Sequence, residues 1–202
     1  FVVEGPLAGG HLGFNADQLE NLEYSLENLV SEVVEVVIPF CEEHEVEIPI
    51  IAAGGIYTGA DIHTFMQLGA AGVQMATRFV ATYECDADIN FKQAYINSCK
   101  EDLVIIKSPV GLPGRAIRNR FLNSVEEGKK KPFKCPYHCI ITCNCADSPY
   151  CIALALLNAK RGKLNKGFAF AGKNAYKIDR IISVKELIAS LMEEYEVATT
   201  VL

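Results

Sequence analysis

Short apolar runs alternate with segments of helical periodicity along the first half of the chain. Residues 1–3, 49–53 and 72–76 are apolar runs, and a loop rich in glycine or threonine follows each of them. This alternation predicts parallel β-strands joined by crossover helices, the pattern of an α/β fold. Pro39 is expected to kink or end the first of these helices. That helix is predicted from apolar residues three or four positions apart, at Leu19, Leu22, Leu26, Leu29 and Val33.

The second half of the chain does not continue this alternation of apolar runs and helical segments. Residues 103–106 form another apolar run that could be a short extra strand, and a loop rich in proline and glycine over 108–114 leads into a basic stretch over 115–120. We therefore predict a boundary near residue 108, with one part over 1–107 and a smaller part over 108–202. A solvated or internally paired helix face is favoured for the basic stretch, and a site for a substrate phosphate or carboxylate is the alternative.

The composition predicts a globular protein that acts on a small molecule. Half of the 202 residues are hydrophobic, and the formal net charge is -6, which gives no general attraction to nucleic acid or anionic membranes. No apolar run approaches the roughly 18 residues of a membrane-spanning helix, and the first residues lack the pattern of a signal peptide. We therefore expect a cytoplasmic protein with a small-molecule substrate, no nucleic-acid partner and no membrane partner.

Two loops that follow the second and third apolar runs are candidate phosphate sites. The first contains Gly54 and Gly55, and the second contains Ala76 and Thr77. Backbone amides without bulky side chains can approach an anion closely, and the loops after the last two strands of a (β/α)₈ barrel commonly bind phosphate. The alternative is that these glycines only make tight turns.

His11 is the strongest candidate for a catalytic side chain. It follows Gly9 and Gly10 in a loop at the carboxyl end of the first predicted strand. An imidazole takes up or releases a proton near neutral pH, so His11 suits a general base or a hydrogen-bond donor. A structural or surface role is the alternative. The remaining histidines lie on predicted helices or among cysteines, at His44, His63 and His138.

Four segments of the chain together resemble one enzyme family. Residues 4–13, 49–56, 69–82 and 108–122 are similar to the nitronate monooxygenase family, once called 2-nitropropane dioxygenases, and to the related FMN-dependent enoyl-acyl-carrier-protein reductases. The resemblance implies strands six to eight of a (β/α)₈ TIM barrel, with a small additional cysteine-rich subdomain. It also implies that FMN is the cofactor.

The resemblance assigns roles to individual residues. His11 matches the active-site histidine, Gly9 and Gly10 match residues that lie against the flavin, and Gly54 and Gly55 match phosphate-binding glycines. The other implied cofactor-binding residues are Glu4, Gln74, Met75, Ala76 and Thr77. Residues 170–172 resemble an element that closes over the site in relatives.

Three positions depart from the family pattern. Leu7 stands where relatives often have glutamate, so a carboxylate role there is lost. Ala76 replaces a glycine, although alanine can still donate its amide. Glu4 stands where some relatives have glutamine and others glutamate, which favours the enoyl-reductase side.

Five cysteines crowd into 17 residues of the second half, at Cys135, Cys139, Cys143, Cys145 and Cys151. Eight cysteines in all, scattered or clustered without a disulfide-like framework, indicate a reduced compartment. Four thiolates in such a loop could enclose an iron–sulfur cluster or a zinc ion, although the spacing matches neither a zinc ribbon nor a ferredoxin. The preferred ligand set is Cys135, Cys139, Cys143 and Cys151, and reduced or redox-sensitive thiols are the alternative.

Three functions therefore remain open. The first is oxidation of alkyl nitronates with dioxygen by an FMN enzyme, and the second is enoyl-thioester reduction in which NAD(P)H reduces FMN. The third is a non-catalytic fragment or binding module. Three strands cannot close a barrel, so both enzyme hypotheses need a missing N-terminal barrel half or a homo-oligomeric partner.

Overall fold

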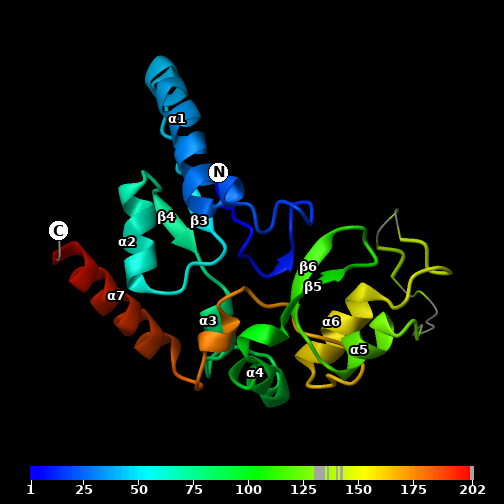
Figure 1. Cartoon of the computed structure of the whole chain (residues 1–202). Helices are drawn as coiled ribbons and strands as arrows, with labels where there is room; N and C mark the ends of the chain where they lie inside the picture. The colour runs from blue at the N-terminus through cyan, green and yellow to red at the C-terminus, as the bar shows by residue number, and fades with distance from the viewer. Residues whose placement is uncertain (130–134, 136, 140, 142, 201–202) are drawn as a thin grey trace.

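A computed structural model describes residues 1–129, 135, 137–139, 141 and 143–200. The chain has the predicted α/β fold, with strands gathered in two small sheets and helices packed around them (Figure 1). No helix in the described part of the chain is both long enough and apolar enough to cross a lipid bilayer.

The first sheet is parallel and has the strand order β1-β3-β4. These strands are Val2–Glu4, Ile51–Ala53 and Gly72–Gln74, which correspond to the three apolar runs of the sequence. Glu4 pairs with Ala53 and Ala53 pairs with Gln74, so all three strands end at one edge of the sheet. Within the described residues neither the outer edge of β1 nor that of β4 has a strand partner, so this sheet is open.

Helix α1 (Leu26–His44) projects away from the rest of the molecule (Figure 1). Pro39 was expected to kink or end the helix, and the helix continues through it, so it does not end there. Proline removes only one backbone hydrogen bond, and the carbonyl left without it belongs to Glu35, which is exposed and can be hydrated. The helix ends at Glu45, whose φ of 53° is left-handed and whose amide donates to the Cys41 carbonyl.

Helix α2 (Gly59–Gln67) connects β3 to β4 and begins with a complete capping box. The Thr58 side chain accepts a hydrogen bond from the Asp61 amide, and the Asp61 carboxylate accepts one from the Thr58 amide. These bonds satisfy amides that the first turn of a helix leaves without partners. Helices α1 and α2 cover the parallel sheet through a core that contains Leu26, Val30, Ala52, Ile56, Phe65 and Ala70.

The second sheet is antiparallel and has the strand order β2-β6-β5. Its strands are Gly10–His11, Pro113–Ile117 and Leu103–Lys107. Strands β5 and β6 form a hairpin, and the predicted boundary near residue 108 falls inside the turn of that hairpin. The division into parts 1–107 and 108–202 stays a prediction.

Aromatic side chains form the core beneath the second sheet. Phe168 is fully buried, stacks on Phe121 and meets Tyr150 and Phe170 edge to face. Such pairs add about 0.5–1.5 kcal/mol each beyond area burial, so this cluster fixes the helices of the second half against the hairpin. The remaining helices are α3 (Thr77–Val80), α4 (Ile89–Ile96), α5 (Arg120–Glu126), α6 (Ile152–Lys160) and α7 (Val184–Thr200), and the 3₁₀ turns are η1 (Leu22–Tyr24), η2 (Lys100–Asp102) and η3 (Ala175–Lys177).

Candidate functional site

The loop between β1 and β2 carries His11 from the first sheet to the second. It leaves β1 at Glu4, and His11 pairs with Gly114 of β6. Glu4 itself is exposed at the end of β1; desolvation of its carboxyl raises its pKa, and a hydrogen bond from the Gly13 amide opposes that shift. The loop therefore starts at the carboxyl edge of the parallel strands and places the candidate catalytic histidine in the antiparallel sheet.

The His11 ring is held by one hydrogen bond and one aromatic contact. Its Nε2 lies 2.7 Å from the Oγ of the buried Ser108, and its ring meets Phe170 edge to face with centroids 5.0 Å apart. Burial lowers the pKa of His11 below its usual value of 6.5. A neutral imidazole at neutral pH, with no described partner at Nδ1, can accept a proton there.

The turn after β3 presents backbone amides that the protein does not use. Gly54 and Gly55 have φ values of 94° and 90°, which only glycine adopts readily. Within the described residues, the amides of Gly54, Gly55 and Ile56 donate to no hydrogen-bond acceptor. The carbonyl of Gly55 is held at 2.6 Å by the Asn174 side-chain amide. Free amides on a fixed turn are what an oxyanion needs.

The end of β4 lies beside this turn. Gln74 pairs with Ala53, and Met75, Ala76 and Thr77 lead into α3. Gln74 and Ala76 are exposed, and Met75 and Thr77 are half-buried. The Thr77 hydroxyl accepts a hydrogen bond of 3.1 Å from the Gly172 amide. The two loops predicted to bind phosphate are therefore adjacent, as their strand register requires.

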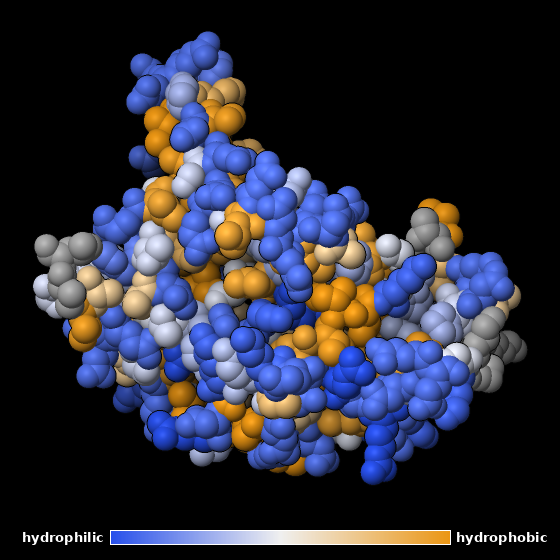
Figure 2. Space-filling view, viewed as in Figure 1, coloured by the Kyte–Doolittle hydropathy of each residue, from blue (hydrophilic) through white to orange (hydrophobic). Residues whose placement is uncertain are grey.

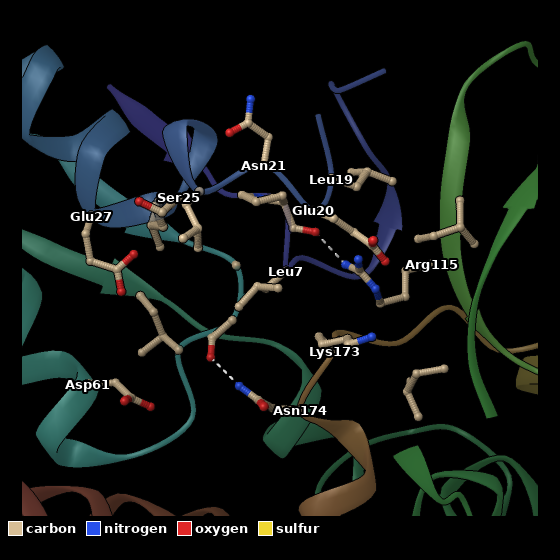
Figure 3. Close-up of a pocket in the computed structure, with 18 of the residues that line it drawn as sticks. Leu7, Leu19, Glu20, Asn21, Ser25, Glu27, Asp61, Arg115, Lys173 and Asn174 are labelled. Atoms are coloured by element: carbon tan, nitrogen blue, oxygen red, sulfur yellow. Dashed lines mark hydrogen bonds between the residues drawn. The ribbon is translucent and has the colours of Figure 1, made fainter. Parts of the chain in front are cut away.

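Two cations lie at Tyr57, two residues after the turn. Arg78 donates to the Tyr57 carbonyl at 2.9 Å, and its guanidinium carbon and the Lys177 ammonium lie 4.7 and 5.3 Å from the Tyr57 ring centroid. Lys177, Lys173 and the Gly54–Gly55 turn line one pocket of about 570 Å³. The pocket has mixed charge, because Glu20, Glu27 and Asp61 line it as well (Figure 3), and its two lysines are the part that suits a phosphate.

Residues 170–174 join every part of this site. Phe170 packs on His11, the Ala171 amide donates to the Arg115 carbonyl, and the Gly172 amide reaches Thr77. The Lys173 amide donates to the Leu7 carbonyl at 3.0 Å, and Asn174 holds Gly55. The sequence predicted that residues 170–172 lie at the site, from their similarity to an element that closes over it in relatives. Nothing in the sequence singled out Lys173, Asn174 or Ser108.

Arg115 lies on a buried strand and not on the helix face that was expected for the basic stretch. Only part of the basic stretch lies on a helix: Arg120 is exposed at the start of α5, whereas Arg115 belongs to strand β6 and is buried, with its guanidinium bonded to the carbonyls of Pro6 and Ala8. Arg118 is exposed and pairs with Glu126 at 3.3 Å. The expected internal pairing holds for Arg118, and Arg115 turns out to be part of the site.

The five clustered cysteines surround a separate cavity of about 270 Å³, which His138 and Ile152 also line. The Cys135 sulfur accepts a hydrogen bond of 3.4 Å from the His138 amide; that bond, a second one from the Tyr137 amide and one from the Cys145 thiol lower its pKa. In the described residues no group of three or more cysteine, histidine or acidic side chains is arranged to hold a metal ion. The ligand set Cys135, Cys139, Cys143 and Cys151 stays a prediction.

A family model described as nitronate monooxygenase matches residues 1–194. This chain belongs to the nitronate monooxygenase family. A probable nitronate monooxygenase of Staphylococcus aureus strain Newman is 36% identical over 127 residues, which are 62% of this chain and 33% of that protein. A probable nitronate monooxygenase of Staphylococcus saprophyticus is 35% identical over 129 residues, which are 62% of this chain and 34% of that protein.

Two solved structures share the fold of this family member. FabK from Thermotoga maritima superposes with a TM-score of 0.71 at 28% identity, over 98% of this chain and 55% of FabK. A nitroalkane oxidase from Streptomyces ansochromogenes superposes with a TM-score of 0.68 at 24% identity, over 99% of this chain and 52% of that protein. The chain thus matches about a third of the length of the curated relatives and spans about half of the solved structures.

Proposed function

We propose that this chain carries the phosphate-binding and proton-handling part of a nitronate monooxygenase-like FMN oxidoreductase. The observation that supports this most is that a turn with three amides unpaired within the described residues packs against Leu7 and Ala8, in the loop that leads to the His11 imidazole. An amide cradle suits the phosphate of a nucleotide cofactor, and the histidine suits a reaction that handles a substrate proton.

The residues present fit FMN. The amides of the turn at Gly54 and Gly55 and those of Ala76 and Thr77 would hold the phosphate, with Lys177 beside them. Gly9 and Gly10 would lie against the flavin ring, and Glu4, Gln74 and Met75 at the strand ends would complete the contacts. When bound, FMN would accept an electron from the substrate anion and pass reducing equivalents to dioxygen, chemistry that side chains cannot supply.

His11 and Ser108 would handle the substrate proton. With its proton on Nε2, the imidazole donates to the Ser108 hydroxyl 2.7 Å away and leaves the Nδ1 lone pair for the substrate. A proton gained at Nδ1 makes an imidazolium, which strengthens the bond to Ser108 because the donor is then charged. Phe170 keeps water from one face of the ring.

Anaerobic reduction tests this proposal. The complete protein, purified and assayed for bound flavin, should be yellow, and addition of propyl-2-nitronate without oxygen should bleach the flavin band. His11→Asn should keep the flavin and should lose at least about 100-fold in the rate at which 2-nitropropane, whose α proton must first be removed, bleaches the flavin. Bleaching by propyl-2-nitronate, which has already lost that proton, should be unchanged in His11→Asn. His44→Gln, at the exposed end of α1, is the control and should react as wild type with both compounds. A colourless wild-type protein, or equal bleaching by 2-nitropropane in wild type and His11→Asn, would refute the assignment.

The enoyl-reductase reaction is the second candidate. Glu4 and the 28% identity to FabK favour it weakly. In that case NADH or NADPH should bleach the flavin quickly and the nitronate should not, so the same anaerobic experiment separates the two reactions. A non-catalytic binding module would show neither bleaching nor stoichiometric flavin.

We also propose that further barrel strands, from an N-terminal barrel half or from a homo-oligomeric partner, complete this site. Both outer edges of the parallel sheet are open within the described residues, and an apolar groove of about 560 Å³ runs beside β4, lined by Val73, Met75 and Leu191 among others. Apolar side chains also lie exposed along the projecting helix, including Val36 and Phe40 (Figure 2). The mass of the yellow species in native mass spectrometry distinguishes one long chain from an oligomer.

The cysteine cavity has the donor chemistry for zinc or an iron–sulfur cluster. We propose Cys135, Cys139, Cys143 and Cys151 as its ligands and a reducing, cytoplasmic location for the protein, since all eight cysteines are free thiols. Iron, zinc and sulfide analysis tests the ligand set: Cys139→Ser should lose the metal, and Cys99→Ser, exposed and outside the cavity, should keep it.

A further inference from the structure

Arg115 is a buried cation that forms no ion pair with a described carboxylate, although Glu20 lines the same pocket. Its side chain is only 4% exposed, and its Nη1 donates to the carbonyl oxygens of Pro6 and Ala8 at 2.6 Å each. No ion pair joins Arg115 to a carboxylate in the described residues, and its Nε has no hydrogen-bond partner there. Burying a charge that only carbonyl dipoles stabilise lowers the stability of the fold. We therefore expect Arg115 to have a functional role that offsets this cost.

The backbone of Arg115 reaches two further parts of the site. On β6 it pairs directly with Gly10 of β2, and its carbonyl accepts a hydrogen bond of 3.1 Å from the Ala171 amide. One residue therefore ties together the loop from Pro6 to Ala8, the strand that carries His11 and the segment that covers the site.

The Arg115 side chain lies on the face of the second sheet opposite to the His11 ring. His11 pairs with Gly114, and a side chain at Gly114 would meet the Phe170 ring 2.8 Å away, so the His11 ring, Gly114 and Phe170 share one face. Consecutive residues of a strand point to opposite faces, so the Arg115 side chain lies on the other. It lines the pocket beside Gly54 and Lys173 (Figure 3), a pocket whose lining does not include His11.

The two bonded carbonyls set the course of the loop. Pro6 and Ala8 stand on either side of Leu7, and the Leu7 carbonyl is bonded to the Lys173 amide instead. Three successive carbonyls are thus fixed by partners from the second half of the chain. Because Gly9 and Gly10 follow directly, these three bonds also restrict where their backbone lies.

We propose that Arg115 is a positioning residue that holds the loop before His11 in the conformation that receives the flavin. The proposal rests on the function proposed above, and it extends that function to a residue that does not contact the reacting atoms. Arginine suits this role because its guanidinium stays charged when buried and can offer several N–H groups at once. Lysine, with a shorter reach and a compact charge, replaces it only in part.

Amide hydrogen exchange and flavin titration together test the proposal in the complete protein. Arg115→Met should raise the exchange rates of the Ala8 amide, which donates to the Gly5 carbonyl, and of the Gly10 amide on β2 by about tenfold or more, whether or not flavin is present. FMN affinity should fall about ten- to a hundredfold, as expected for the loss of charge-assisted hydrogen bonds. Arg115→Lys should recover part of both losses.

Controls separate positioning from general damage. Arg118→Met, three residues along and exposed, should change neither loop exchange nor FMN affinity. If Arg115→Met fails to fold, Arg115→Ala with added guanidinium should regain loop protection, because the small cation can occupy the vacated space. Wild-type exchange rates and FMN affinity in Arg115→Met, or the absence of guanidinium rescue in a folded Arg115→Ala, would overturn the proposal. If wild type binds no FMN yet the exchange change is seen, the positioning role stands and the flavin function fails.

Discussion

Three glycines near His11 offer a graded test of how the site is built, because each has a different physical reason to be glycine. A Cβ on Gly9 would lie 2.9 Å from the Ala171 carbonyl oxygen and closer still to the Ala171 carbonyl carbon and the Gly172 nitrogen. A Cβ on Gly10 would meet nothing within 4 Å, but its φ is 90°. A Cβ on Gly13 would also meet nothing, and Gly13 is outside the left-handed region.

The expected costs follow from these differences. Gly9→Ala forces backbone against backbone, with no side-chain tip to move aside, so we expect it to lower the free energy of unfolding by about 3 kcal/mol, the upper end for overpacking. Gly10→Ala should lower it by roughly 1–2 kcal/mol, from the left-handed backbone alone. Gly13→Ala should stay within about 0.5 kcal/mol of wild type.

Urea unfolding followed by far-ultraviolet circular dichroism measures all three, since the chain has no tryptophan. With a slope of about 2–3 kcal/mol per molar, Gly9→Ala should move the midpoint down by about 1–1.5 M. The close packing of the loop against residues 171–172 would be refuted if Gly9→Ala and Gly13→Ala had the same midpoint. A ranking with Gly10→Ala as the most destabilised variant would show that backbone conformation, not contact, decides this loop.

Three further predictions concern single groups. The imidazole NMR signal that is missing in His11→Asn should titrate below pH 6.5, because burial disfavours the cation; protonation of the unfolded chain then makes stability fall as pH drops below 6.5. Thr58→Ala should cost about 1 kcal/mol in urea unfolding through loss of the cap on α2, whereas Thr64→Ala, exposed on the same helix, should cost less than about 0.5 kcal/mol. Tyr150→Phe should be neutral or raise the unfolding midpoint, because the buried Tyr150 hydroxyl has no hydrogen-bond partner within the described residues.

The sequence predicted the parallel sheet well because its signals are local. Each of the three parallel strands is a short apolar run stopped by a loop, and the positions of Gly54 and Thr77 at adjacent strand ends follow from that pattern alone. Parallel strands that follow one another along the chain bring their carboxyl ends to one edge, so the two loops predicted to bind phosphate had to be neighbours.

Of the second sheet, only β5 could be predicted, from the apolar run over 103–106, and β2 and β6 escaped prediction because they depend on distant partners. Strand β2 is only Gly10–His11, too short for any periodicity, and it exists because β6 pairs with it about 100 residues later. Strand β6 contains a proline, a glycine and an alanine, which have low strand propensity. The burial of Arg115 could not be read from a basic stretch, since its partners are the carbonyls of Pro6 and Ala8 rather than a patterned set of acids.

Folding couples the two halves of the site at the level of single residues. The turn at Gly54 and Gly55 belongs to the parallel sheet and His11 to the antiparallel one, so neither sheet alone fixes the distance between them. Residues 170–174 fix it, because they contact His11, Arg115, Thr77, Leu7 and Gly55 from one short segment. In the proposed function the turn holds the flavin phosphate and His11 accepts the proton, so changes in this segment, about 160 residues after His11 in the sequence, should alter flavin affinity and proton transfer together.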